Sequence, residues 1–164
     1  MRLKDILQRF RQALGRIRAR LLSLQDAPRK IALGFALGIL IGMTPFWGVH
    51  IPTSFLAAVV LRCSKIAAIA GVQITNVGTA PLIYPVNYWV GVKLVGVSQQ
   101  VDWPQALDYH QMFQLFEQSP LILVDLCIGG LILGLPLAVI GYFTALRVMQ
   151  TLRRRSRALS PGVN

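Results

Sequence analysis

Two interruptions in long apolar stretches hold most of the side chains that could bind a ligand. The polar and aromatic residues in or near these interruptions are Thr44, Trp47, His50, Asn76, Thr79, Tyr84 and Asn87. Such side chains donate and accept hydrogen bonds, so together they could hold a polar or anionic group. A lone histidine such as His50 is more commonly a hydrogen-bonded packing residue than a proton carrier.

The chemistry that the sequence offers is binding rather than catalysis. No nucleophile, base and orienting acid occur together, and the chain has neither a zinc-ligand spacing nor a phosphate-binding glycine loop. We therefore expect no enzyme, no metal and no cofactor.

Lys93 and Asp125 are two charged residues near the ends of apolar segments. A carboxylate inside an apolar segment needs a partner, and both residues are expected at similar depth, so the sequence suggests an ion pair between them. The alternative is that each side chain reaches separately to the nearby membrane interface.

The apolar segments themselves determine the expected fold class. Residues 31–61 carry no charged side chain and would measure roughly 46 Å as one helix, against about 30 Å of bilayer hydrocarbon. Pro45 and Pro52 each lack a backbone N–H and flank the centre of this run, which predicts a helix, a break and a second helix. Alternatively, the prolines only kink the helices, and neighbouring segments cover the backbone carbonyls that lose their hydrogen bonds.

A second uncharged run, residues 66–92, is interrupted in the same manner, and residues 121–146 form a plain spanning helix. The two interrupted runs hint at internal repetition. Paired broken segments in a small membrane protein point to a binding site, because irregular backbone at membrane depth must be buried or line a cavity.

Glycines recur at helix-packing intervals. Gly34, Gly38 and Gly42 share one helical face, and Gly130 and Gly134 form a second pair. Small residues at this spacing allow close approach of another helix, from the same chain or from a second copy in a homo-oligomer.

The basic residues predict the orientation in the membrane. Of seventeen Lys and Arg residues, nine lie in residues 1–30 and five in residues 147–157, whereas residues 98–120 carry Asp and Glu but no Lys or Arg. Both termini, together with Arg62 and Lys65, are therefore expected on the cytoplasmic side. We expect the net charge of +11 to attract anionic lipid headgroups. Because the sequence has no nucleic-acid recognition motif, we expect no nucleic-acid partner.

These observations predict an all-α integral membrane protein. Its expected parts are an amphipathic basic N-terminal helix (1–28), a membrane domain (29–157) and a disordered tail (158–164). Within the membrane domain, the first run enters and returns as a re-entrant helical hairpin. The second run crosses outward as a broken membrane helix, and the final transmembrane helix crosses back.

Three stretches of sequence also carry a resemblance. They are GFALGILIGMTPFWGVH (34–50), LRCSKIAAIAG (61–71) and TNVGTAPLIYPVNYWVG (75–91). In them the chain resembles the bacterial membrane family catalogued as domain of unknown function twenty sixty-two. Relatives often carry Asn-Pro and then Thr-x-Pro in the second break, whereas Val77 follows Asn76 here. The resemblance implies a multi-pass protein of the bacterial inner membrane and brings no established activity.

Two functions are compatible with these features. The first is membrane-embedded transport or lipid handling through the two broken segments, with the basic helix gathering anionic lipid. The second is a noncatalytic membrane scaffold, or a subunit of a larger membrane complex, that uses its glycine faces for partner helices.

Overall fold

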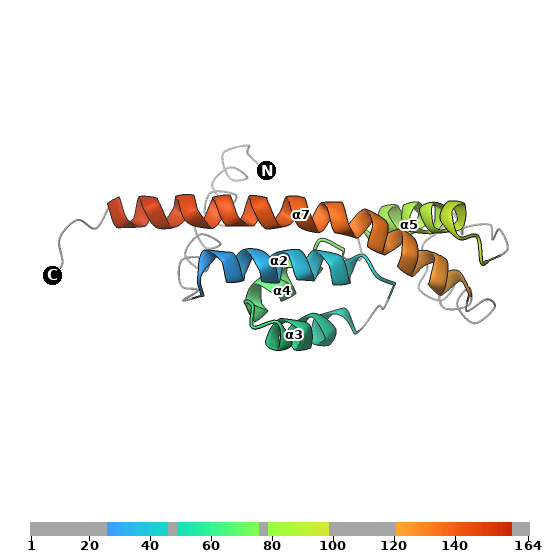
Figure 1. The fold of residues 1–164 in the computed structure, drawn as a ribbon, viewed down its shortest axis with the longest axis horizontal. Coiled ribbons are helices and arrows are strands. Elements are labelled where there is room, and N and C mark those ends of the chain that lie inside the picture. Colours follow the sequence, from blue (N-terminus) through green and yellow to red (C-terminus); the bar gives the residue numbers. More distant parts are fainter. Residues whose placement is uncertain (1–25, 46–48, 76–78, 99–120, 159–164) are drawn as a thin grey trace, which may run out of the picture.

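The computed structural model describes residues 26–45, 49–75, 79–98 and 121–158, and every regular element in these ranges is a helix. The helices are α2 (Pro28–Gly42), α3 (His50–Val60), α4 (Lys65–Val72), α5 (Ala80–Leu94) and α7 (Leu121–Ala158). Figure 1 shows α7 along the whole length of the molecule, with the shorter helices arranged beside it. The expected N-terminal helix and the tail after residue 158 lie outside the described residues.

The first broken run folds back on itself. α2 ends at Gly42, where the Met43 N–H bonds to the carbonyl of Ile39, and α3 then runs back beside α2 (Figure 1). The backbone N–H of Ser64 donates to the carbonyl of Lys30 at 3.1 Å. The chain therefore returns, after α3, to the level at which α2 began.

α2 and α4 lie parallel and in close contact through small residues. A Cβ on Gly34 would meet the carbonyl of Ser64, and one on Gly38 would meet the carbonyl of Ala68. A Cβ on Gly42 would lie 3.2 Å from the carbonyl oxygen of Val72. The close approach that the glycine spacing predicts is therefore made to α4 of the same chain.

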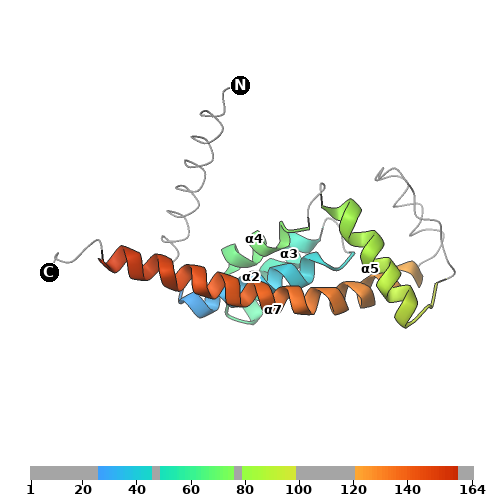
Figure 2. The same cartoon turned by 90° about the horizontal axis from the view of Figure 1, so that it is seen from above.

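The second broken run continues instead of folding back. α4 lies near the C-terminal part of α7, where Ala67 packs with Met149, and α5 lies near its beginning, where Gly91 faces the backbone of Asp125. α4 and α5 thus follow α7 in the opposite direction to its chain, and Figure 2 shows α5 crossing the first part of α7.

The two broken runs have matching boundaries. α2 ends at Gly42 and α3 begins at His50, while α4 ends at Val72 and α5 begins at Ala80, thirty residues later in each case. The contacts of α2 with α4 keep the same offset at all three glycines. This correspondence supports the internal repetition that the sequence hints at.

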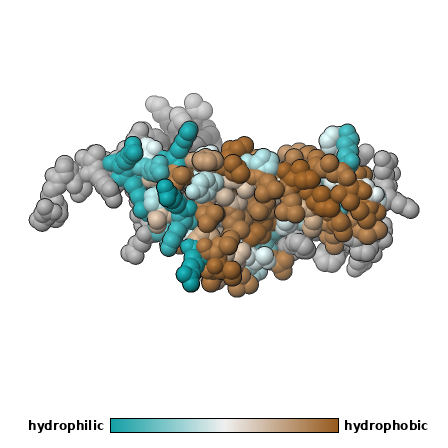
Figure 3. Space-filling view, in the orientation of Figure 1, coloured by the Kyte–Doolittle hydropathy of each residue, from teal (hydrophilic) through white to brown (hydrophobic). Residues whose placement is uncertain are grey.

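One helix in the described ranges is long and apolar enough to cross a membrane. It covers Leu121–Arg154 of α7, with a mean hydropathy of 2.4 in its most apolar part. The basic residues that the structure describes gather mainly at the end of the molecule where α7 finishes. They lie at the start of α2 (Arg29, Lys30), around the turn between α3 and α4 (Arg62, Lys65) and in the later part of α7 (Arg147, Arg153, Arg154), which contacts in the structure bring together. Figure 3 shows this hydrophilic end in teal and, on the same face, a largely apolar surface over the other described residues.

The glycine contact gives a stability prediction. Gly38→Ala should lower the free energy of unfolding by about 1–3 kcal/mol, because the new methyl group would meet backbone atoms of α4 that cannot move aside. Leu33→Ala, on the exposed side of the same helix, is the control and should have a smaller effect. Thermal unfolding of the purified protein in detergent measures both. Equal loss in the two variants would contradict the described packing.

Candidate functional site

The carbonyl end of α2 is the point where most of the described candidate residues meet. The side-chain amide of Asn87 donates from Nδ2 to the carbonyl of Met43 at 2.9 Å. The carbonyl of Thr44 accepts a hydrogen bond from His50 Nε2 at 2.6 Å and one from the Tyr84 hydroxyl at 3.4 Å. The structure thus brings Thr44, His50, Tyr84 and Asn87 together from α3, α5 and the first break.

The local sequence explains why these carbonyls need side-chain partners. The last carbonyls of a helix have no intrahelical donor, and Pro45 directly after Thr44 supplies no backbone N–H. His50 and Asn87 are buried, so their side chains provide these carbonyls with hydrogen-bond donors away from solvent. A carbonyl only accepts, so Nε2 of His50 carries the proton in this contact.

Thr79, the other described candidate of the two breaks, has a partner elsewhere. The Thr79 hydroxyl donates to the carbonyl of Ile74 at 2.7 Å, across the second break itself. Trp47 and Asn76 lie outside the described residues.

Not every polar atom near the break is satisfied. Asn87 is fully buried, and its Oδ1 atom has no hydrogen-bond partner in the described structure. The Thr75 hydroxyl, next to Gly42, is also buried without a partner there. A third such atom is the hydroxyl oxygen of Ser64, at the opposite end of α4.

Asp125 and Lys93 have different partners from the ones that the sequence suggests. The fully buried Asp125 carboxylate accepts from the Ser98 N–H at 2.9 Å, the Ser98 hydroxyl at 2.5 Å and the Val97 N–H at 3.3 Å. The Lys93 ammonium lies 3.9 Å from the centre of the Trp89 ring, on the exposed side of α5. The structure does not bring the two charges together, because the backbone after α5 supplies donors closer to the carboxylate.

Sequence reasoning missed the roles of Ser98 and of the α2 carbonyls. The Ser98 hydroxyl also lies 3.2 Å from the Tyr88 hydroxyl, so it links α5 to Asp125 on α7. A single serine after a helix has no spacing signal, and backbone carbonyls have none at all. The only available signal was the costly position of Asp125, which required some donor.

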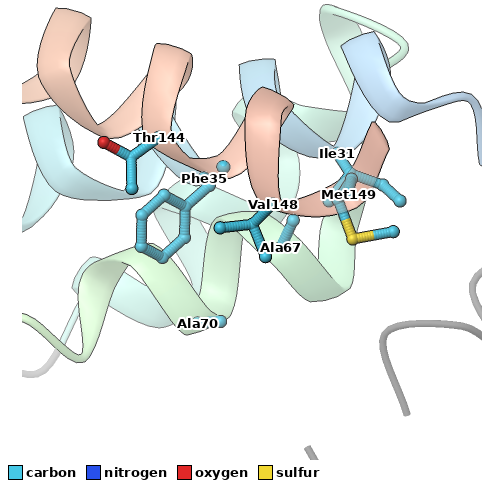
Figure 4. Close-up of a pocket in the computed structure, with 8 residues that line it drawn as sticks. Ile31, Phe35, Ala67, Ala70, Thr144, Val148 and Met149 are labelled. Atoms are coloured by element: carbon cyan, nitrogen blue, oxygen red, sulfur yellow. The ribbon is translucent and has the colours of Figure 1, made fainter. Parts of the chain in front are cut away.

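Sequence reasoning also missed an apolar pocket between α2, α4 and α7. Its volume is about 310 Å³, and Figure 4 shows residues from all three helices around it. It is lined by Ile31, Phe35, Ala67, Ala70, Thr144, Ala145, Val148 and Met149. Three of these are alanines, which leave space between helices where larger side chains would fill it. Such residues look like ordinary helix-packing positions in a sequence.

The two cysteines are free thiols. Cys63, between α3 and α4, is buried, and this burial raises the pKa of its thiol above the usual value. Cys127 lies within α7 and is partly buried.

The Asp125 network gives a second prediction. Asp125→Leu should lower the free energy of unfolding by roughly 3 kcal/mol, because it leaves the donors of Val97 and Ser98 buried without an acceptor. Asp125→Asn keeps one acceptor oxygen and should lose less. Lys93→Gln should change stability by no more than about 0.5 kcal/mol, since its ammonium lies at an exposed ring. If Lys93→Gln destabilised the protein as much as Asp125→Leu in thermal unfolding, the described network would be wrong.

One of three comparisons with known proteins found a match. A search of curated proteins found no match, and a search of solved structures found none either. The profile of a family described as "Uncharacterized protein conserved in bacteria (DUF2062)" matches residues 11–158, most of the chain. The chain therefore belongs to the bacterial family DUF2062.

Proposed function

We propose that this chain is a multi-pass inner-membrane protein that binds anionic phospholipid from the cytoplasmic leaflet. The observation that carries the proposal is the apolar pocket beside the basic end of the molecule. The topology and the lipid site are supported by separate features.

The helix lengths support a re-entrant hairpin. α2 has 15 residues and α3 has 11, which correspond to roughly 22 and 16 Å, less than the approximately 30 Å of a bilayer core. The hydrogen bond from Ser64 to Lys30 joins the end of the hairpin to its beginning. Both ends of the hairpin then face the cytoplasm, as the positive-inside rule favours for Lys30 and Arg62.

The other helices support two crossings. α4 and α5 have 8 and 15 residues, roughly 34 Å in total. α4 lies near the later part of α7 at Met149, and α5 lies against its beginning at Asp125. α7 then crosses in the opposite direction and ends in its basic turns, which returns the C-terminus to the cytoplasmic side.

Labelling tests this topology. In a variant lacking the two native cysteines, a cysteine at Arg62 should react with a membrane-impermeant maleimide only after the inner membrane is opened. A cysteine at Val95, after α5, should react from the outside in intact spheroplasts. Labelling of the Arg62 position from the outside would exclude the hairpin.

The pocket is suited to a hydrocarbon chain. Its lining surface is apolar. Three basic residues lie within two positions of lining residues in the sequence: Lys30, Lys65 and Arg147. An acyl chain in the pocket would gain roughly 0.8 kcal/mol for each buried methylene group, and the basic end would attract its phosphate. His50, Tyr84 and Asn87 instead donate to backbone carbonyls at the end of α2. This arrangement favours lipid handling over transport of a polar solute through the breaks.

The scaffold alternative receives less support. Its expected docking surfaces were the glycine faces, and the Gly34, Gly38 and Gly130 positions are covered by backbone of the same chain. A partner helix, or a second copy, would have to use other surfaces.

Filling the pocket tests lipid binding. Ala70 is exposed at the pocket, so Ala70→Phe should occupy the space without disturbing the core. We expect this variant to lose most of its cross-linking to phosphatidylglycerol that carries a photoreactive group on its acyl chain. Leu82→Phe, exposed on α5, is the matched control and should cross-link like the unmodified protein.

Peptide mapping of the cross-linked product locates the lipid. The proposal expects cross-links in α2, α4 and α7 at the lining residues, and weaker cross-linking with phosphatidylcholine. Equal labelling of both variants, or labelling spread over all apolar surfaces, would contradict a specific lipid site.

A further inference from the structure

We propose that a monovalent cation of the sodium type binds where α2 and α4 end together. The oxygen atoms that would bind it in the described structure are Oδ1 of Asn87, whose amide is held at Met43, and Oγ1 of Thr75, which lies beside Gly42. This inference goes beyond the proposed lipid binding and does not rest on it.

The first support is the arrangement of the two helix ends. α2 and α4 run parallel, so their carbonyl ends lie at the same level. A Cβ on Gly42 would lie 3.2 Å from the Val72 carbonyl oxygen and 3.3 Å from Thr75 Oγ1, which measures how near the two ends are. Each carbonyl end has a partial charge of about −0.5, so two adjacent ends together attract a positive charge.

The second support is the fully buried Asn87 side chain. Its Nδ2 group is used by the Met43 carbonyl, which holds the amide against the end of α2 and leaves Oδ1 without a donor. A buried acceptor without a partner costs about 1–3 kcal/mol. Thr75 Oγ1 is in the same condition on the α4 side of Gly42. A bound cation would satisfy both oxygen atoms.

No lysine or arginine in the described ranges takes this position. Arg29, Lys30, Arg62 and Lys65 lie at the other ends of the short helices, and Lys93 lies in the last turn of α5 against Trp89. The partial negative charge at the helix ends is therefore not neutralised by a lysine or arginine that the structure describes.

The ligand set selects the class of cation. Asn87 and Thr75 offer neutral oxygen atoms, and no group of three His, Cys, Asp or Glu side chains in the described ranges could hold a metal ion. Divalent calcium and magnesium generally require carboxylates, whereas neutral oxygens and the carbonyl ends of broken helices suit sodium. The site would sit near the middle of the proposed membrane topology.

Thermal unfolding in different salts tests the site. The purified full chain in detergent should unfold at a higher temperature in sodium chloride than in N-methylglucamine chloride of equal ionic strength. The difference should be roughly 3 °C or more when sodium is at ten times its dissociation constant. Asn87→Leu should abolish this difference, whereas Asn87→Asp should retain or enlarge it because it adds a charged ligand.

Ser64→Ala is the matched control, since it removes a buried, unpartnered hydroxyl at the opposite end of α4. This variant should keep the full sodium effect. If Asn87→Leu does not fold, Thr75→Val should reduce the effect by itself. Direct binding of radioactive sodium to the same proteins should follow the same order.

The outcomes separate this site from the lipid site. Equal unfolding temperatures in both salts would overturn the proposal and leave a buried water as the partner of Asn87. The same would follow if sodium stabilised Asn87→Leu as much as the unmodified protein. Neither result would alter lipid cross-linking at Ala70, and the loss of lipid binding in Ala70→Phe would leave the sodium effect in place.

Discussion

The close contact between the backbones of α2 and α4 is the constraint on which the rest of the structure depends. Because Gly34 and Gly38 have no side chains, the carbonyls of α4 can lie directly against α2. This contact fixes the two helices as parallel and in register, and it places their carbonyl ends together. α3 and α5 must then begin near that point, which is why His50 and Asn87 can reach the end of α2.

The apolar segments, their interruptions and the packing glycines were accessible from the sequence because each depends on local physical rules. An uncharged run with two prolines cannot form one continuous helix, and glycines spaced by four residues must share a face. The glycine spacing could not show which helix packs on this face, because the surface at Gly38 would accept α4 or a helix of a second copy equally well. That choice depends on how the whole chain closes, which only the tertiary structure decides.

The candidate site was predictable in part for the same reason. Thr44, His50, Tyr84 and Asn87 were recognisable as polar residues in apolar runs, and they do meet. Their partners are backbone carbonyls, which every residue possesses and no sequence pattern marks. The suggested pairing of Lys93 with Asp125 depended on depth alone, whereas the Asp125 carboxylate bonds to the nearby donors of Ser98 and Val97. The pocket beside Ala67 and Ala70 is invisible in the sequence because it results from what small side chains fail to fill.

The matching boundaries of the two broken runs have a consequence for how such a chain is oriented. One run is folded back and the other is extended, although both contain two helices separated by the same number of residues. A folded unit contributes an even number of passages and an extended unit an odd one. Under the proposed topology, the angle at one interruption therefore decides whether the chain crosses the membrane an even or an odd number of times. It thereby decides on which side of the membrane the following segments lie.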